Sequence, residues 1–219
     1  MRRLLWEVVL LLTIFFPPTI FLLPPTPAWG FSTLALNYLA VGTPHIFLII
    51  YLLKLQGEPL EKFGFGRVTA TTFIRALACS LVALALMSAF LLLIRLLPIN
   101  HESSLLRSLP YYPQHLAELA LALPFCLVIG YREELFFRSY LNLRLQELGF
   151  KAKWACLLTA LLFGLAHLSQ GYLSGFAAFL IGLFFGGVFQ TTKDLHSLAL
   201  AHAFYNFLIL AAGLWLGRC

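Results

Sequence analysis

The chain has 219 residues, of which 61% are hydrophobic and 11% are charged, and its formal net charge is +6. A soluble domain averages about 45–50% apolar and about 25% charged residues, so this composition excludes an ordinary soluble protein and predicts an integral membrane protein. The basic residues are scattered between apolar runs, which excludes a nucleic-acid-binding surface as the source of the charge and indicates contact with the lipid bilayer.

The apolar runs have the length of membrane-spanning helices. A helix needs about 20 apolar residues to cross the bilayer, and seven segments approach or meet this requirement, at about 4–23, 34–53, 73–97, 115–137, 153–169, 175–191 and 195–216. The predicted fold class is therefore all-α, a polytopic integral membrane helical bundle of about seven transmembrane helices. Pro124 and Gly130 predict a kink in the fourth segment.

The chain divides into two parts by the distribution of its polar groups. Residues 1–110 form N-terminal transmembrane helices that carry no diagnostic motif. Residues 115–216 hold nearly all strongly polar side chains of the late spans. The loop charges also indicate an orientation: with the N-terminus inside, inner segments carry ten lysines and arginines and outer segments carry three, which favours a cytoplasmic N-terminus. The small size favours a prokaryotic inner membrane.

The first polar group is Glu133-Glu134 with Arg138, directly after an apolar run. Ionisable side chains at membrane depth cost roughly 2.5–3.5 kcal/mol each, so they indicate a functional site. On a helix, Glu134 and Arg138 are one turn apart and form a favourable pair. Glu133 points about 100° away, so we expect it to be the carboxylate that faces a cavity and acts as a base.

Two further polar groups follow at the same helical spacing. Phe163 and His167 are one turn apart, as are His202 and Asn206. Glu133 and His167 together suit the deprotonation of a water molecule. The pair His202 and Asn206 suits two hydrogen-bond donors aimed at one oxygen atom. Each group alone could also serve only the fold. His167 could be a histidine hydrogen-bonded to a neighbouring helix, Asn206 could link two helices, and Glu134 and Arg138 could be a stabilising ion pair.

Other intramembrane chemistries lack their residues. Asp194 is the only aspartate, which excludes an aspartyl dyad, and neither HExxH nor a serine-nucleophile motif is present. The four cysteines lack metal-binding or disulfide spacing. Glutamate, histidine and asparagine remain as the candidate catalytic residues.

These motifs resemble the CPBP family, also called the Abi or CAAX prenyl protease 2 (Rce1-like) family of glutamic-type intramembrane endopeptidases. The family carries EExxxR, FxxxH and HxxxN or HxxxD on successive helices. The resemblance covers about residues 115–212, and residues 115–216 are thereby identified as a CPBP/Abi-like catalytic membrane core. One departure is Ser139, where the family often has glycine after the motif arginine.

The resemblance implies an intramembrane endopeptidase that hydrolyses a membrane-associated protein or peptide, prenylated or not. It implies that Glu133 and His167 activate water, and that His202 and Asn206 stabilise the oxyanion. It further implies that Glu134, Arg138 and Phe163 are supporting residues. It also implies that catalysis needs no metal and no other cofactor, with zinc held by the glutamates and histidines ranked second. The alternative is a non-catalytic immunity or scaffold protein that retains the protease fold. A small transporter with a proton relay is a third reading, although no inverted repeat is found.

Overall fold

The structure is a computed structural model, and it describes residues 2–16, 30–96 and 112–216. Within these ranges all regular structure is helical. The α-helices are α1 (Arg2–Phe15), α3 (Phe31–Leu55), α4 (Ala70–Arg95), α6 (Leu116–Glu133), α7 (Asn142–Glu147), α8 (Ala152–Ala166), α9 (Tyr172–Thr192) and α10 (Leu195–Leu216). Two short 3₁₀-helices are η1 (Leu60–Phe63) and η4 (Leu168–Gln170), and η3 (Glu134–Leu141) is a π-helix.

Four of these helices, namely α3, α4, α9 and α10, are long and apolar enough to cross a membrane. The apolar α8 has 15 residues and is shorter than its predicted segment. Only the first part of the predicted segment 4–23 is described, as α1, and its remainder lies outside the described residues. The all-helical membrane fold is confirmed, whereas the count of about seven transmembrane helices remains a prediction.

Large apolar side chains cover the outside of α4. Phe73, Ile74, Leu77 and Leu81 are all exposed on this helix. A continuous apolar surface of this kind is unfavourable in water but is well solvated by lipid tails. The chain is therefore an integral membrane protein, as its composition predicts.

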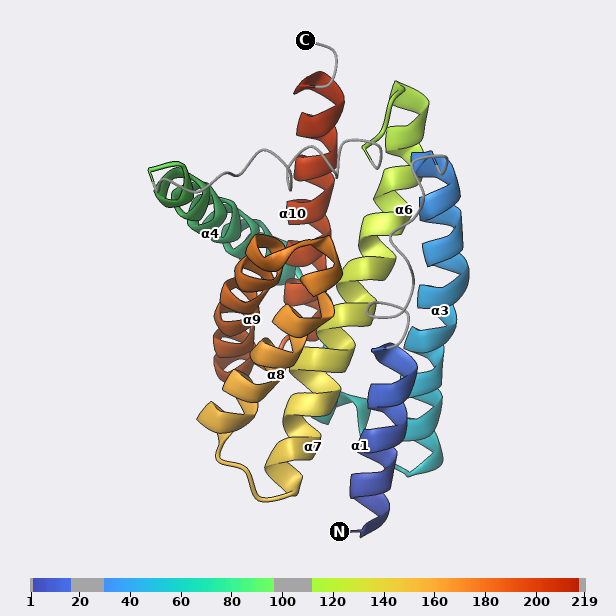
Figure 1. The fold of residues 1–219 in the computed structure, drawn as a ribbon. Helices are drawn as coiled ribbons and strands as arrows, with labels where there is room; N and C mark the ends of the chain where they lie inside the picture. The colour runs from blue at the N-terminus through green and yellow to red at the C-terminus, as the bar shows by residue number, and fades with distance from the viewer. Residues whose placement is uncertain (1, 17–29, 97–111, 217–219) are drawn as a thin grey trace.

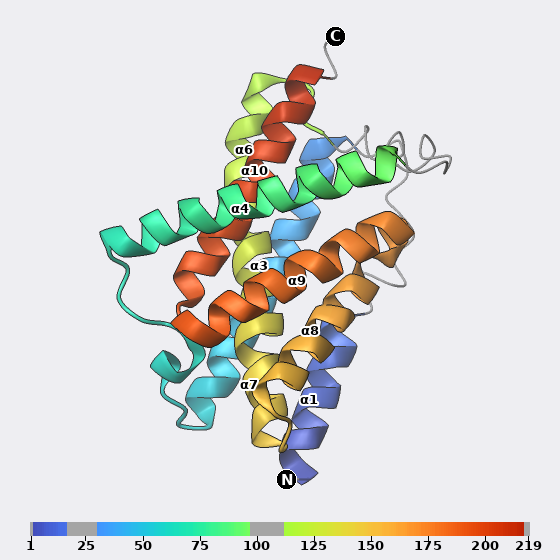
Figure 2. The same cartoon turned by 90° about the vertical axis from the view of Figure 1, so that its left-hand side faces the viewer.

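The helices surround α10, which packs against α6, α4 and α9. Figure 1 shows α6 beside α10, with α3 on the far side of α6. In Figure 2, α4 crosses α10 obliquely, and α8 lies against α9. This arrangement brings η3, which continues α6, into contact with α8, α9 and α10. The polar residues of three separate sequence motifs thus meet inside one bundle.

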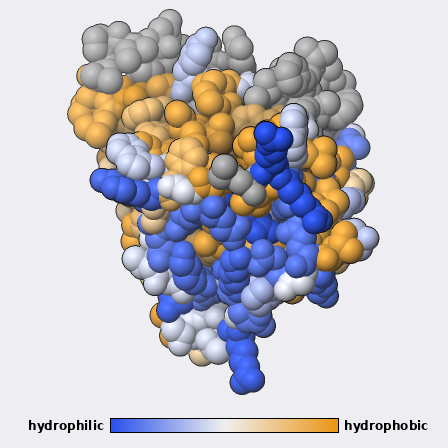
Figure 3. Space-filling model, turned by 90° about the horizontal axis from the view of Figure 1, so that it is seen from below, coloured by the Kyte–Doolittle hydropathy of each residue, from blue (hydrophilic) through white to orange (hydrophobic). Residues whose placement is uncertain are grey.

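One end of the bundle is hydrophilic. The start of α1, the end of α3 and the connection from α7 to α8 lie at one end, while α10 finishes at the other (Figure 1). Seen from below, the first end is hydrophilic over its centre (Figure 3). This distribution agrees with the charge asymmetry of the sequence. The assignment of this end to the cytoplasm remains a prediction.

A buried arginine joins the elements at the polar end. The side chain of Arg144 is 2% exposed, and its Nη1 atom lies 2.7 Å from Glu147 and 2.9 Å from Glu58. Its Nη2 atom donates a hydrogen bond to Gln56 Oε1 at 2.7 Å, and it lies 3.6 Å from Glu7 of α1. A buried guanidinium is tolerated only when it is paired in this way, so the cluster holds α1 and α7 to the end of α3.

Candidate active site

The EExxxR motif lies where α6 becomes the π-helix η3. The sequence predicts a kink at Pro124 or Gly130, but α6 continues through both residues to Glu133. The irregularity instead begins at Glu134, and all eight residues of η3 are buried. Segments of π-helix are rare and are frequent at functional sites. The α-helical spacing assumed from sequence therefore describes this motif only approximately.

Gly130 brings α10 close to this segment. A Cβ atom at residue 130 would collide with the carbonyl oxygen of Ala199 on α10. Only glycine permits this approach of the two backbones. Because α6 and α10 touch here, His202, one turn further along α10, comes within reach of the glutamates that follow Gly130.

Glu134 is held by two partners at once. Its Oε2 atom lies 3.2 Å from Arg138 Nε, and the two side chains are 0% and 1% exposed. This contact confirms the pair predicted from sequence. Its Oε1 atom lies 2.7 Å from His202 Nδ1, a contact that the sequence analysis does not predict. Glu134 thus contacts both Arg138 and His202, although its Oε2 atom has no hydrogen bond among the described residues.

Glu133 keeps one carboxylate oxygen free. Its Oε1 atom accepts a hydrogen bond from the hydroxyl of Tyr38 at 3.2 Å. Its Oε2 atom lies 3.8 Å from His202 Nε2 and, although buried, has no hydrogen-bond partner among the described residues. Buried polar atoms without a partner are rare and indicate strain or a catalytic role. Glu133 Oε2 therefore lies in the cluster with no contact closer than the 3.8 Å to His202 Nε2 among its ionic partners.

Phe163 lies between Arg138 and His167. The guanidinium carbon of Arg138 lies 4.0 Å from the centre of the Phe163 ring, within cation–π range. The ring centres of Phe163 and His167 are 4.5 Å apart. The Nη atoms of Arg138 have no hydrogen-bond acceptor among the described residues, so the aromatic face is their main favourable contact. Phe163 thereby forms a wall between Arg138 and His167.

His167 lies directly after the end of α8, and its orientation is set by its own helix. Its Nδ1 atom lies 2.8 Å from the carbonyl oxygen of Phe163. Since a carbonyl only accepts, Nδ1 carries the proton and Nε2 is left as an acceptor. The ring interacts electrostatically with Glu133. The structure thus brings the predicted pair Glu133 and His167 into one site.

Asn206 is one turn beyond His202 on α10 and is half-buried. Its side chain forms no hydrogen bond with the part of the chain that the structure describes. His202 differs from the expectation of a free donor, because its Nδ1 atom already contacts Glu134. Only the Nε2 atom of His202 is left for a reacting group.

A second set of polar residues next to Glu133 is absent from the sequence prediction. Tyr38 and His45 of α3 both contact Arg132, at 2.9 Å and 3.0 Å. Their spacing of seven residues places them two turns apart on the same helix face. Two polar side chains at this spacing in an otherwise apolar segment are the sequence signal by which Tyr38 and His45 could have been found. Residues 1–110 therefore contribute directly to the site, although they carry no motif.

Ser139, where the family often has glycine, is also accounted for. Its hydroxyl donates a hydrogen bond of 2.6 Å to the carbonyl oxygen of Phe63 in η1, and both residues are buried. The serine therefore attaches η1 to the π-helix and leaves the neighbouring carboxylates unchanged.

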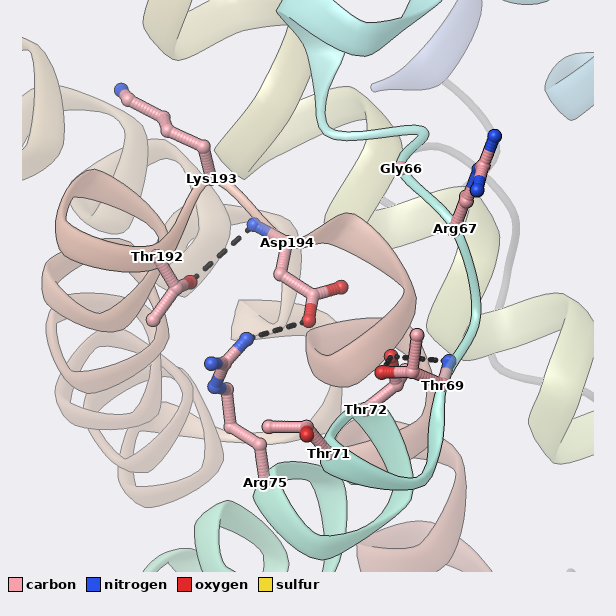
Figure 4. Close-up of a pocket in the computed structure, with 9 residues that line it drawn as sticks. All are labelled: Gly66, Arg67, Thr69, Thr71, Thr72, Arg75, Thr192, Lys193 and Asp194. Atoms are coloured by element: carbon pink, nitrogen blue, oxygen red, sulfur yellow. Dashed lines mark hydrogen bonds and ion pairs between the residues drawn. The ribbon is translucent and has the colours of Figure 1, made fainter.

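A pocket of about 310 Å³ lies elsewhere, between the start of α4 and the end of α9. Figure 4 shows Arg75 directed at Asp194, 2.7 Å from its carboxylate, with Arg67 and Lys193 at the rim. None of the predicted site residues lines it. The pocket is thus distinct from the cluster around Glu133.

The residues present do not favour a metal centre. Among the described residues, no group of three or more His, Cys, Asp or Glu side chains is arranged to hold a metal ion. Within the cluster, Glu134 is already bound by Arg138 and His202. A guanidinium at this distance competes with a cation for the same carboxylate.

Comparison with known proteins identifies the second half of the chain. The family model described as type II CAAX prenyl endopeptidase Rce1-like matches residues 115–208. Neither the curated proteins nor the solved structures contain a match. The matched segment includes all three motifs, which confirms the resemblance seen in the sequence and supports a protease. Residues 115–208 of this chain are therefore similar to the type II CAAX prenyl endopeptidase Rce1-like family.

Proposed function

We propose that this protein is an intramembrane endopeptidase in which Glu133 and His167 activate the attacking water. The observation that carries the proposal is the buried Oε2 atom of Glu133, which has no hydrogen-bond partner among the described residues. Glu134 Oε2 also lacks a hydrogen bond, but it lies 3.2 Å from Arg138 Nε, whereas Glu133 Oε2 has its ionic contact only at 3.8 Å, with His202. The family match supports the same reaction class.

The first step is attack on the peptide carbonyl. A water molecule lies between Glu133 Oε2 and His167 Nε2. It gives one proton to one of these two groups, which acts as the base, while its oxygen bonds to the carbonyl carbon. A tetrahedral intermediate with a negative oxygen results. The same base then returns the proton to the departing nitrogen, the carbon–nitrogen bond breaks, and a carboxylic acid and an amine are released.

The second requirement is a place for the negative oxygen. We assign His202 Nε2 and the amide of Asn206 as its donors, since they are neighbours on one face of α10. Nε2 donates only when His202 carries both ring protons, because its Nδ1 proton is directed at Glu134. Glu134 then stabilises the resulting imidazolium, while Arg138 and Phe163 hold Glu134 and His167 in place.

The proposed substrate is a membrane-associated protein or peptide, prenylated or not, that reaches the cluster from the bilayer. The apolar outer surface of the bundle supports this route. We further propose a prokaryotic inner membrane as the location, with the polar end at which α1 begins on the cytoplasmic side. The lysines and arginines of the inner loops support this orientation.

The test compares protein termini in the native host by mass spectrometry. Wild type, Glu133→Gln and His167→Gln are expressed at matched levels, with Glu118→Gln as the control. Glu118 is a carboxylate on the same helix whose partners are Ser32 and the Gln114 backbone. We expect new termini in wild type and the control, and none in the other two variants.

Identical termini in all four strains contradict the proposal. If Glu133→Gln also restores the phenotype of a deletion strain, the protein is a scaffold or immunity factor that retains the protease fold.

A further inference from the structure

We infer that Tyr38 of α3 is a positioning residue for Glu133, so that the N-terminal helices complete the site. This inference rests on the proposed function for its catalytic meaning. Its structural content does not, because the contact between Tyr38 and Glu133 is present whatever reaction takes place. Tyr38 lies outside the segment that matches the family.

The direction of each hydrogen bond follows from the donors available. Arg132 Nη1 lies 2.9 Å from the Tyr38 hydroxyl oxygen, and a guanidinium can only donate. The hydroxyl has one proton, and it is directed at Glu133 Oε1 at 3.2 Å. Tyr38 therefore accepts from a cation and donates to an anion, which makes it a bridge between the two charges.

Arg132 has no other charged partner in this network. Its side chain is buried, its Nε atom donates to His45 Nδ1 at 3.0 Å, and its Nη2 atom lies 3.4 Å from the Phe15 carbonyl oxygen. Both partners are uncharged acceptors, namely the Phe15 carbonyl and the His45 imidazole in its neutral form. The carboxylate with which Arg132 forms an ion pair is that of Glu133, at 4.0 Å. A buried charge needs such compensation, so the positive charge of Arg132 acts on Glu133 directly and through Tyr38.

This network determines which oxygen of Glu133 reacts. Oε1 is occupied by Tyr38, which leaves Oε2 directed toward His202. The orientation of a carboxylate about its final torsion is soft, so a hydrogen bond to one oxygen is an effective way to fix the other. Tyr38 itself is not placed against the reacting atoms and acts only through Glu133.

The decisive variant is Tyr38→Phe, which removes the hydroxyl and keeps the ring. Its matched control is Tyr51→Phe on the same helix, because the Tyr51 side chain is 61% exposed. The purified full-length protein in lipid is measured by infrared spectroscopy, and the Glu133 carboxyl bands are assigned by subtraction of the Glu133→Gln spectrum. We expect these bands to shift in Tyr38→Phe and to stay unchanged in Tyr51→Phe.

Turnover is then measured on the peptide whose cleavage is lost in Glu133→Gln. We expect kcat to fall about 10–100-fold in Tyr38→Phe, since misplacement of a catalytic group has costs of this order. KM is expected to match that of Tyr51→Phe.

Two results overturn the inference. One is an unchanged Glu133 band in Tyr38→Phe, and the other is a shifted band with wild-type kcat. Failure of the proposed function is recognised separately, as identical protein termini in wild type and Glu133→Gln. In that event the infrared comparison alone decides whether Tyr38 holds Glu133.

Discussion

The Nδ1 atom of His202 lies 2.7 Å from the Oε1 atom of Glu134, inside a site where both side chains are buried. The two residues are 68 positions apart in sequence and belong to different motifs. The carboxylate oxygen accepts the bond from the histidine, and the other oxygen of Glu134 lies 3.2 Å from Arg138 Nε. The histidine proton is therefore on Nδ1, and the Nε2 atom faces the second glutamate, 3.8 Å from Glu133 Oε2.

Replacement of Glu134 by glutamine tests the importance of this contact. Glutamine keeps the shape but removes the negative charge of the group that accepts the hydrogen bond from His202 Nδ1. We expect turnover to fall about 100-fold or more, by analogy with carboxylates that orient catalytic histidines. Glu61→Gln, an exposed carboxylate in η1, is the control. A wild-type rate in Glu134→Gln would show that His202 does not need the carboxylate.

Arg138→Met tests the buried ion pair. The change leaves Glu134 buried and without its cation, which costs roughly 3–5 kcal/mol of unfolding free energy. The matched change is Lys62→Met, since the Lys62–Glu58 pair is 38% and 22% exposed and exposed pairs contribute about 0–1 kcal/mol. Equilibrium unfolding in mixed micelles measures both. Similar losses for the two variants would contradict the prediction.

Gly130→Ala tests the close approach of α6 and α10. The added methyl group would meet the carbonyl of Ala199, and we expect a loss of roughly 1–3 kcal/mol from overpacking. Gly187→Ala on α9 is the control because no atom lies within 4 Å of the added carbon. That change should stabilise its helix by roughly 0.5–1 kcal/mol. Thermal unfolding of both variants in the same lipid shows whether Gly130→Ala loses stability and Gly187→Ala gains it.

The charged cluster at the polar end predicts sensitivity to acid. Hydrogen bonds from Lys62 and then Arg144 hold the pKa of Glu58 below its ordinary value of 4.5. Burial alone would raise the pKa of Glu147, but hydrogen bonds from the same two cations outweigh burial and lower it. A lowered folded-state pKa stabilises the protein above the unfolded pKa, and this stabilisation is lost as the pH falls through the folded value.

We therefore expect the unfolding free energy to decrease as the pH falls below about 4.5. Lys62→Gln should weaken this dependence, because both glutamates lose a hydrogen-bond donor. Lys153→Gln, an exposed lysine at the start of α8, should leave it unchanged. Unfolding measured across the acid range in each variant is the test, and equal slopes for both variants would refute the assignment.

The sequence by itself determined the class of protein and one ion pair of the candidate site. Apolar runs of helical length predict a membrane bundle, because no other use of such runs satisfies the backbone in lipid. The motif spacings predict the pair Glu134–Arg138, since residues four apart meet on one helix whatever the rest of the fold does. The three ordered motifs also predict the similarity to the Rce1-like family that the family model finds over residues 115–208.

Only the tertiary structure decided which residues from distant segments meet. The contact of His202 with Glu134 depends on how closely α10 approaches α6, which is a property of packing at Gly130. The bond from Tyr38 to Glu133 depends on the side of α6 that α3 covers. Helical spacing relates residues within one helix, whereas the rotation and separation of two packed helices follow from the side chains of both.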